Sequence, residues 1–423
     1  MCSFGKIMER DKRIGNVRVG SKSFAIGVGC MNYIIAGIGL ITVFLLAWLA
    51  SSNKKRIRYR PILIMILIQI VFGLLLLRTN IGLILISGIA NSFSVLLEYA
   101  YEGINFVFGG IANPGASPFF LQVLLPIVFV SALIGILQYT RILPLFIHYV
   151  GLVLSKVNGM GKLESYNAIA SAIVGQSEVF ITVKKQLGAI PENRLYTLCA
   201  SAMSTVSMSI VGSFMTMLKP EYVVAALVLN LFGGFIIASI ITPYEVKPED
   251  DLLDQEKEER QAFFEMLGEY ILDGFKVAVV VAAMLLGFIA IIAMVNGLFS
   301  AVFGISFQAL LGYVFAPLAF LMGVPWHEAV QAGSIMATKI VANEFVAILD
   351  FTKIQGQLSE RTVAIVSVFL ISFANFGSIG TIVGAVKGLN ERQGNVVARF
   401  GLKLLYGATL VSILSGIIIS IVV

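Results

Sequence analysis

Two short polar motifs interrupt long apolar stretches of the sequence. The first motif places Gln176, Ser177 and Glu178 together, and the second places Asn343 beside Glu344. Amide, hydroxyl and carboxylate groups in this combination can donate hydrogen bonds to a neutral polar ligand and accept them from it. An anionic ligand such as a dicarboxylate would call for arginine, and neither motif contains one. These residues therefore predict recognition of an uncharged polar molecule.

Each of these glutamates is followed, about 30 residues later, by a second polar interruption of an apolar segment. Serine and threonine residues break the segment 204–212, and Asn375 and Ser378 break the segment 375–381. Phe373 lies two residues before Asn375 and could offer its ring face to a planar base, although a Phe in a membrane helix more commonly packs. The polar residues thus fall into two similar units.

Composition decides which environment must position these side chains. Of the 423 residues, 58% are hydrophobic and only 13% are charged, which is typical of a membrane protein. Apolar stretches of about 18 to 25 residues recur, as a membrane-spanning helix requires. They are continuous rather than alternating, so helices and not a barrel are predicted. The net charge of +6 gathers in short loops, where it indicates cytoplasmic connections rather than nucleic-acid binding.

The sequence predicts an all-α polytopic protein with about eight transmembrane helices. The segment 81–110 is apolar but broken by Gly, Asn, Ser and Glu, so it is predicted to lie at the membrane interface. Basic loops place both termini on the outer side. The predicted spans are 33–50, 61–77, 119–139, 195–218, 222–241, 275–293, 362–386 and 402–423.

The two glutamate motifs lie in segments that do not fit a simple span. Segments 164–187 and 307–351 carry polar residues at their centres, which predicts two re-entrant hairpins. An odd number of crossings separates the hairpins, so the two units of hairpin and broken helix are predicted to be inverted repeats. This is the architecture of a secondary transporter.

A carboxylate at membrane depth is costly, so Glu178 and Glu344 must face the interior of the helix bundle. Their role could be structural, as halves of buried ion pairs. Lys339 could pair with Glu344, and Lys184 or Lys185 with Glu178. Binding of a solute is the favoured interpretation because two such motifs occur at matched positions.

The sequence contains no complete motif of the enzyme classes considered. His327-Glu328 has no second His one helical turn later, so a zinc protease site is incomplete, and no metal site is assigned. Neither a nucleophile elbow nor a phosphate-binding loop is present in the sequence. The protein is therefore predicted not to be an enzyme, to need no cofactor, and to use an ion gradient for accumulation. A passive channel for small polar solutes is the alternative.

Three regions are expected along the chain. Residues 1–30 are basic and lack the apolar core of a signal peptide, so they are interpreted as a disordered or mis-assigned extension, with Met31 as a second candidate start. Residues 31–110 form N-terminal scaffold helices, and residues 111–423 form the transporter core.

The motif residues resemble the concentrative nucleoside transporter family, in its bacterial nucleoside permease branch. Gly175–Glu178, Asn343–Phe345 and Ser372–Phe376 carry the resemblance, which extends over nearly the whole chain from Met31. Supporting stretches are Ser155–Gly161, Ala202–Ser209 and Gly394–Gly401.

The resemblance implies cation-driven uptake of nucleosides, with a preference for pyrimidines, by a homotrimer in the bacterial inner membrane. Each subunit would have eight spans, two re-entrant hairpins and an elevator-type transport domain. It also implies which residues bind the substrate. The nucleobase would meet Gln176, Ser177 and Glu178, the ribose hydroxyls would meet Glu344, Asn375 and Ser378, and the nucleoside would lie against Phe373.

The resemblance also implies a place for the coupling cation. Relatives that use sodium hold it between the first hairpin and the next span, which corresponds here to Ser171, the Val174 carbonyl, Ser209 and the Ile210 carbonyl. Ser171 replaces an Asn of the sodium pattern, and its shorter side chain would leave the ion under-coordinated unless a water is added. A proton is therefore favoured over sodium as the coupling cation, with buried Glu344 as its first candidate carrier.

Overall fold

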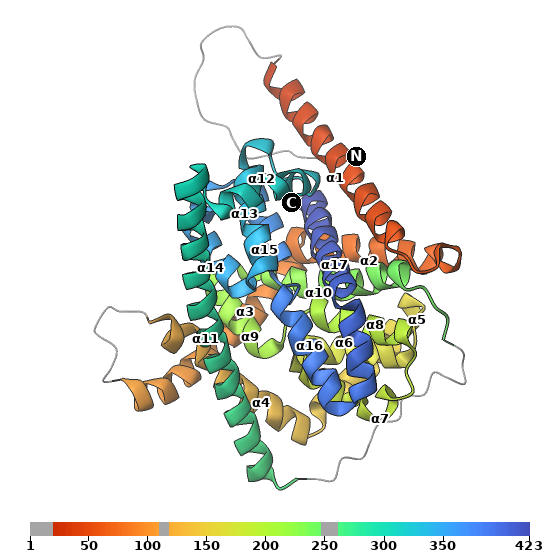
Figure 1. Cartoon of the computed structure of the whole chain (residues 1–423), viewed down its shortest axis with the longest axis vertical. Coiled ribbons are helices and arrows are strands. Elements are labelled where there is room, and N and C mark those ends of the chain that lie inside the picture. Colours follow the sequence, from red (N-terminus) through yellow and green to blue (C-terminus); the bar gives the residue numbers. More distant parts are fainter. Residues whose placement is uncertain (1–19, 110–117, 247–260) are drawn as a thin grey trace.

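The computed structural model describes residues 20–109, 118–246 and 261–423, and within these ranges the chain is almost entirely helical and contains no strand (Figure 1). A π-helical turn at Phe120–Leu124 leads into α4, and short 3-10 helices occur at η1 (Lys54–Arg56), η3 (Glu178–Val183) and η5 (Gln355–Gln357). The α-helices are α1 (Gly20–Leu49), α2 (Tyr59–Arg78), α3 (Asn80–Phe108), α4 (Pro126–Tyr139), α5 (Ile142–Asn158), α6 (Lys162–Val174), α7 (Lys184–Leu187), α8 (Glu192–Ser204), α9 (Met208–Met217), α10 (Pro220–Ile241), α11 (Phe263–Phe303), α12 (Phe307–Leu321), α13 (Trp326–Val341), α14 (Glu344–Ile354), α15 (Glu360–Leu370), α16 (Phe376–Leu389) and α17 (Glu391–Val422).

Among the described residues, seven helical segments are long and apolar enough to cross a membrane, or eight if one bent pair counts as a span. This agrees with the prediction of about eight spans. The longest is α11, whose 41 residues would extend about 60 Å, roughly twice the thickness of the hydrocarbon core. It forms one long edge of the molecule in Figure 1.

Two N-terminal segments can be compared with the sequence-based expectations. Helix α1 begins at Gly20 and so includes residues 20–30, and residues 1–19 lie outside the described residues. The interpretation of residues 1–30 as a disordered or mis-assigned extension stays a prediction. Helix α3 runs without interruption through its Gly, Asn, Ser and Glu residues, and by length and composition it qualifies as a span. Its predicted location at the membrane interface stays a prediction.

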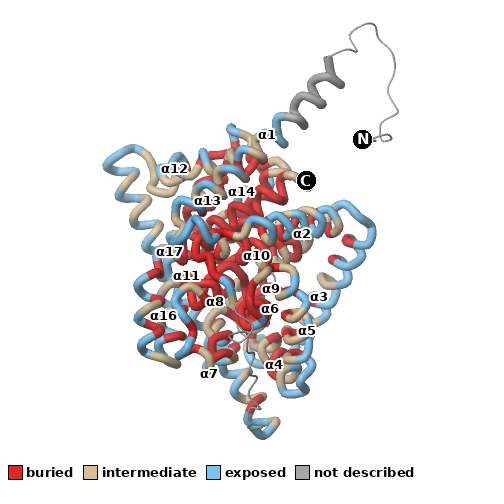
Figure 2. Tube along the Cα trace, turned by 90° about the vertical axis from the view of Figure 1, so that its right-hand side faces the viewer, coloured by how far each residue is buried: buried red, intermediate tan, exposed pale blue. Residues whose placement is uncertain are grey.

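The core of the molecule is built around α10 and α17 (Figure 2). Most residues of both helices are buried, whatever side of the helix they occupy, which is typical of a helix surrounded by protein. The long helix α11 is the opposite case, because only Met266, Gly274, Ala278 and Leu285 are buried along it. Helices α3 and α11 therefore present wide apolar surfaces on the outside of the subunit.

Both predicted hairpins exist, but the bounds of the second differ. Hairpin 1 consists of α6, η3 and α7, with its turn at Gly175–Ser177. Hairpin 2 consists of α13 and α14, with its turn at Ala342–Asn343. The prediction began hairpin 2 at residue 307, but α12 bends away from α13 by 116° and is a separate helix. Hydrophobicity is continuous up to this bend, and the sign of the break is Gly323 and Pro325 between the two helices.

Each hairpin is followed by a broken helix, as the inverted-repeat prediction requires. In the first repeat α8 ends at Ser204 and α9 starts at Met208, and in the second repeat α15 ends at Leu370 and α16 starts at Phe376. The first arm of each hairpin packs on the first half of its own broken helix, α6 on α8 and α13 on α15. The second arm contacts the second half of the other broken helix, η3 on α16 and α14 on α9. The two repeats are thus interlocked.

A buried carboxylate fastens the base of each hairpin at the same relative position. Glu164, the third residue of α6, accepts hydrogen bonds from the guanidinium of Arg194, the third residue of α8, with an Nε–Oε1 distance of 2.5 Å. Glu328, the third residue of α13, accepts from Ser359 at the start of α15 and from Thr362, the third residue of that helix. This correspondence is independent of the glutamates at the hairpin turns and supports the internal repeat.

Candidate functional site

The turn of hairpin 1 depends on Gly175, which has a φ of +118°. A Cβ at this position would lie 2.7 Å from Oε2 of Glu178 and 3.4 Å from Cβ of Ser207. Glycine is therefore required both by the backbone conformation and by the close approach of the Glu178 carboxylate. The side chain of Glu178 is exposed, and the Oε1 atom of Gln176 is buried with no hydrogen-bond partner in the described part of the chain. A buried acceptor without a donor is a place where a ligand N–H can bind.

The turn of hairpin 2 is shaped by a helix cap. The Oδ1 atom of Asn343 accepts a hydrogen bond from the backbone N–H of Val346 at 2.9 Å, so Asn343 caps the N-terminus of α14. Glu344 is consequently the first residue of that helix, where the helix dipole favours a carboxylate. Only 5% of Glu344 is exposed, and its Oε2 atom accepts from the Nδ2 atom of Asn375 at 2.9 Å.

Asn375 connects hairpin 2 with the second broken helix. Its Nδ2 atom donates to Glu344, and its Oδ1 atom accepts from the backbone N–H of Ser378 at 2.8 Å, which caps α16. Asn375, Ser378 and Phe373 are all buried. Three of the predicted residues, Glu344, Asn375 and Ser378, thus form one hydrogen-bonded group at the N-termini of two half-helices.

The two helix breaks contact each other directly. The backbone N–H of Phe373 in the second break donates to the carbonyl of Thr205 in the first break, at 3.2 Å. The rings of Phe214 on α9 and Phe345 on α14 lie 4.9 Å apart, which adds a second contact between the repeats. Backbone that leaves the helix at membrane depth needs such partners. The hairpin turns and the helix breaks therefore converge on one region, as predicted.

Hairpin 1 reaches this region through packing. Its η3 segment, which begins at Glu178, packs on α16, the helix that carries Ser378. Its turn lies against the first helix break, because a Cβ at Gly175 would be 3.4 Å from Cβ of Ser207.

Lys339 was considered above as an ion-pair partner of Glu344, and its contacts differ from that expectation. Within the described residues its Nζ atom makes no ion pair with Glu344, and it binds the Phe369 carbonyl and the hydroxyls of Ser372 and Ser412 instead. Proximity in sequence indicated an ion pair across the hairpin turn. The side chain instead reaches the second broken helix. The five-residue spacing between Lys339 and Glu344 could not reveal this direction.

The oxygen atoms considered for a coupling cation lie on two helices that are in contact, α6 and α9. The Ser171 hydroxyl is buried, donates to the Ala168 carbonyl at 2.9 Å and lies 3.2 Å from the Thr205 hydroxyl. The Ser209 hydroxyl lies 2.9 Å from that of Ser207. Both hydroxyls thus already have protein partners, and a cation at this place would have to share them.

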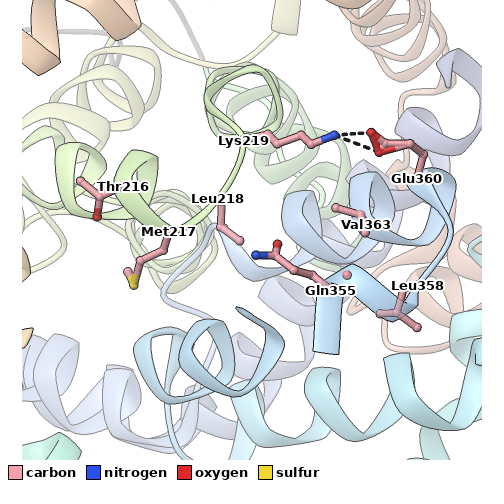
Figure 3. Close-up of a pocket in the computed structure, with 9 residues that line it drawn as sticks. Thr216, Met217, Leu218, Lys219, Gln355, Leu358, Glu360 and Val363 are labelled. Carbon is pink, nitrogen blue, oxygen red and sulfur yellow. Dashed lines mark hydrogen bonds and ion pairs between the residues drawn. The ribbon is translucent and has the colours of Figure 1, made fainter. Parts of the chain in front are cut away.

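A separate cavity of about 500 Å³ opens away from the predicted binding residues (Figure 3). It is bordered by Lys219 and Glu360, whose side chains form an ion pair across it. The hydrogen bond that Lys219 donates to Glu360 raises the pKa of the Lys219 ammonium group. Helices α9 and α15 each run about 15 Å from this cavity to the helix breaks, so it lies one half-helix away from the site. The lining residues are Thr216, Met217, Leu218, Lys219, Gln355, Gly356, Leu358, Glu360 and Val363.

Two inverted repeats, each with a re-entrant hairpin and a broken helix that meet at polar residues, define a polytopic membrane transporter rather than an enzyme. Three family models match the chain in succession. They are described as the N-terminus of Na+ dependent nucleoside transporters over residues 38–111, nucleoside recognition over residues 120–221, and the C-terminus of Na+ dependent nucleoside transporters over residues 222–420. The chain belongs to the concentrative nucleoside transporter family.

Individual relatives agree with this assignment over almost their whole length. The chain is 35% identical over 396 residues to the purine nucleoside transport protein NupG of Bacillus subtilis, covering 93% of this chain and 100% of the relative. It is 31% identical over 400 residues to the nucleoside permease NupC of Helicobacter pylori, covering 90% and 96%.

Solved structures with the same fold include CNTnw in an inward-facing, substrate-bound state. That structure is 31% identical, covers 92% of this chain and 99% of its own, and superimposes with a TM-score of 0.87. A variant of CNTnw in an outward-facing state gives the same TM-score of 0.87 over 93% of this chain. The chain is therefore a multi-pass membrane nucleoside transporter.

Proposed function

We propose that this protein takes up nucleosides by symport with a cation, and that the substrate binds where the hairpin turns meet the helix breaks. The observation that carries the proposal is the hydrogen bond from Asn375 to Glu344, which joins a hairpin turn and a helix break through two groups that can also bind hydroxyls. The proposed substrate-binding residues are Gln176, Ser177, Glu178, Glu344, Phe373, Asn375 and Ser378.

Each part of a nucleoside has a chemically suitable partner in this set. The buried Gln176 Oε1 atom lacks a donor in the described part of the chain, and a nucleobase N–H can supply one. The Glu344 carboxylate has accepting capacity beyond its bond from Asn375, and ribose hydroxyls can donate to it. Phe373 is buried two residues before Asn375, and its apolar ring can cover a planar base.

We propose the proton as the coupling cation, with Glu344 as its carrier. The identity of residue 171 supports this choice, because a serine side chain is shorter than the Asn of the sodium pattern and would leave a sodium ion under-coordinated. The family description names sodium, so sodium is the alternative. In that case Ser171, the Val174 carbonyl, Ser209 and the Ile210 carbonyl would provide the oxygen ligands.

The preference for pyrimidines is kept as a prediction that competition can test. One relative is named a purine nucleoside transport protein, which favours the opposite preference. Uridine and guanosine should therefore be compared as competitors of labelled uridine uptake.

We further propose a homotrimer in the bacterial inner membrane that works by an elevator-type movement. The wide apolar surfaces of α3 and α11 support an assembly through these outer helices. The interlocked hairpins and broken helices support movement of the site as one body.

Uptake of labelled uridine into proteoliposomes tests the proposal under an imposed proton gradient, an imposed sodium gradient, or none. Accumulation driven by protons alone is expected. Accumulation with sodium alone would reject the proton and keep symport, and equilibration without accumulation under any gradient would favour the passive channel. The Ser171→Asn variant adds an amide oxygen at the cation position and is expected to become sodium-dependent.

A further inference from the structure

Lys339 places a cation in the centre of the molecule. The residue is fully buried near the C-terminus of α13. Its Nζ atom donates to the carbonyl of Phe369 at 2.6 Å, to the Ser372 hydroxyl at 2.6 Å and to the Ser412 hydroxyl at 3.1 Å, and it lies 4.5 Å above the ring of Phe369. The three N–H groups of the ammonium are thus all directed at oxygens.

These contacts hold the unwound backbone between α15 and α16. Phe369 and Ser372 flank the end of α15, where helix carbonyls lose their partners. Neighbouring groups of the same break are held from other helices, since the Nδ2 atom of Asn230 donates to the Ile371 carbonyl at 2.5 Å and Thr205 accepts from Phe373. Lys339 is therefore one of three anchors of the segment that leads into Phe373 and Asn375.

An uncharged donor would suffice to anchor the backbone, as the Asn230 amide does at the Ile371 carbonyl. A buried ammonium is costlier than an amide at membrane depth, so its charge requires a counterpart. Two are at hand. Glu344 begins α14, which packs against α13 across the hairpin turn and brings an opposite charge into the same hairpin. The C-terminal end of α15 carries partial negative charge.

The separation between Lys339 and Glu344 matters for binding. A direct ion pair would occupy the carboxylate oxygens. Because Lys339 instead donates to the break, Glu344 keeps its bond from Asn375 and its remaining acceptor capacity.

We propose that Lys339 is a positioning residue for nucleoside recognition, which fixes the break between α15 and α16 and balances the charge of Glu344 without touching the substrate. The inference rests on the proposed function, because it assumes that Glu344 and Asn375 meet the ribose hydroxyls.

The test compares Lys339→Met, which keeps most of the side-chain length but removes the charge and the donors, with Lys339→Arg, which keeps both. Lys353→Met is the matched control, because Lys353 lies exposed on α14 of the same hairpin and pairs with Asp350. Dissociation constants for uridine and 2′,3′-dideoxyuridine are measured on the purified full-length proteins, together with thermal unfolding.

If Lys339 positions the ribose-binding groups, Lys339→Met weakens uridine binding about tenfold or more, as expected for lost charge-assisted hydrogen bonds. Binding of 2′,3′-dideoxyuridine, which lacks the 2′- and 3′-hydroxyls of the ribose, should change far less. The preference for uridine should thus shrink in Lys339→Met, recover in part in Lys339→Arg and stay unchanged in Lys353→Met. A folded Lys339→Met protein that keeps the full preference for uridine would overturn the proposal.

If Lys339→Met does not fold, a second variant tests the proposal. Ser372→Ala removes one of the three acceptors of Lys339 and retains the charge, so a smaller loss of preference for uridine is expected, and an unchanged preference would again overturn the proposal. Failure of the proposed function is distinguishable, because the wild-type protein itself would then fail to prefer uridine over dideoxyuridine.

Discussion

At the scale of single residues, Asn375 performs two tasks with one carboxamide. It donates to Glu344 and caps α16 through the N–H of Ser378. Loss of an N-cap alone costs about 1 kcal/mol of helix stability. Loss of the bond to Glu344 would in addition release the carboxylate from the orientation in which it meets a ligand.

The variant Asn375→Ala is therefore expected to lose far more nucleoside affinity than stability. Asn390→Ala is the matched control, because Asn390 caps α17 through the N–H of Gln393 at 3.0 Å and has no carboxylate partner in the described structure. Isothermal titration with uridine and thermal unfolding should show similar stability losses in both variants. Equal affinity losses in both variants would show that capping, and not recognition, explains the effect of Asn375.

The residues themselves could be predicted from the sequence because polar side chains are rare in apolar segments and therefore conspicuous. Gln176, Glu178, Glu344 and Asn375 are predicted as site residues in this way. The partner of Lys339 could not be predicted, since the reach of a long side chain depends on which helices pack around it. The bonds of Asn230 and Thr205 to the second break could not be predicted either, because both arise from contacts between segments that are distant in the sequence.

At the scale of helices, the two hairpins are fastened by different chemistry. Glu164 pairs with Arg194 in a buried ion pair, whereas Glu328 accepts from the neutral groups of Ser359 and Thr362 and lies 3.6 Å from the exposed ring of His327. Removing one charge of a buried ion pair leaves the other without compensation, which costs about 3–5 kcal/mol. A carboxylate bonded to neutral donors can be replaced by an amide at a smaller cost, about 1–3 kcal/mol.

We therefore expect Glu164→Gln to lower the thermal unfolding temperature of the protein clearly more than Glu328→Gln. Thermal unfolding monitored in detergent compares the two. Equal shifts would mean that Arg194 finds another partner when Glu164 is neutral. A larger shift for Glu328→Gln would contradict the ranking of the two fastenings.

Helix bounds were predictable where hydrophobicity changes and unpredictable where it does not. The span at 222–241 agrees closely with α10, which a proline begins and a polar loop ends. The bend between α12 and α13 lies in apolar sequence, so hydrophobicity does not reveal it. Gly323, with a φ of +98°, provides the sharp turn there, and Pro325 directly precedes α13. A glycine and a proline two residues apart were the sequence signal for this break.

At the scale of the whole molecule, the subunit has two kinds of surface. The core around α10 and α17 is enclosed, while α11 exposes large side chains along most of its length, Leu272, Leu286 and Val302 among them. Lipid can cover such a surface, and so can a second copy of the chain.

The proposed trimer predicts that native mass spectrometry of the detergent-solubilised protein gives three times the subunit mass of 45.7 kDa. A Leu286→Arg variant places a charge on the exposed face of α11 and is expected to reduce the trimer fraction if that face is the interface. Leu83→Arg on exposed α3 tests the other face in the same way. A purely monomeric wild-type protein under mild conditions would contradict the proposed assembly.

The direct hydrogen bond between the two helix breaks has a consequence for energetics. Because Phe373 of one repeat is tied to Thr205 of the other, whatever orders one break also orders the second. Occupancy beside the first break and occupancy beside the second are then thermodynamically linked, and linkage is reciprocal. If a cation next to Ser209 tightens nucleoside binding by some factor, the nucleoside tightens cation binding by the same factor. One backbone contact between the repeats thus gives the proposed symport a direct structural connection between its two binding positions.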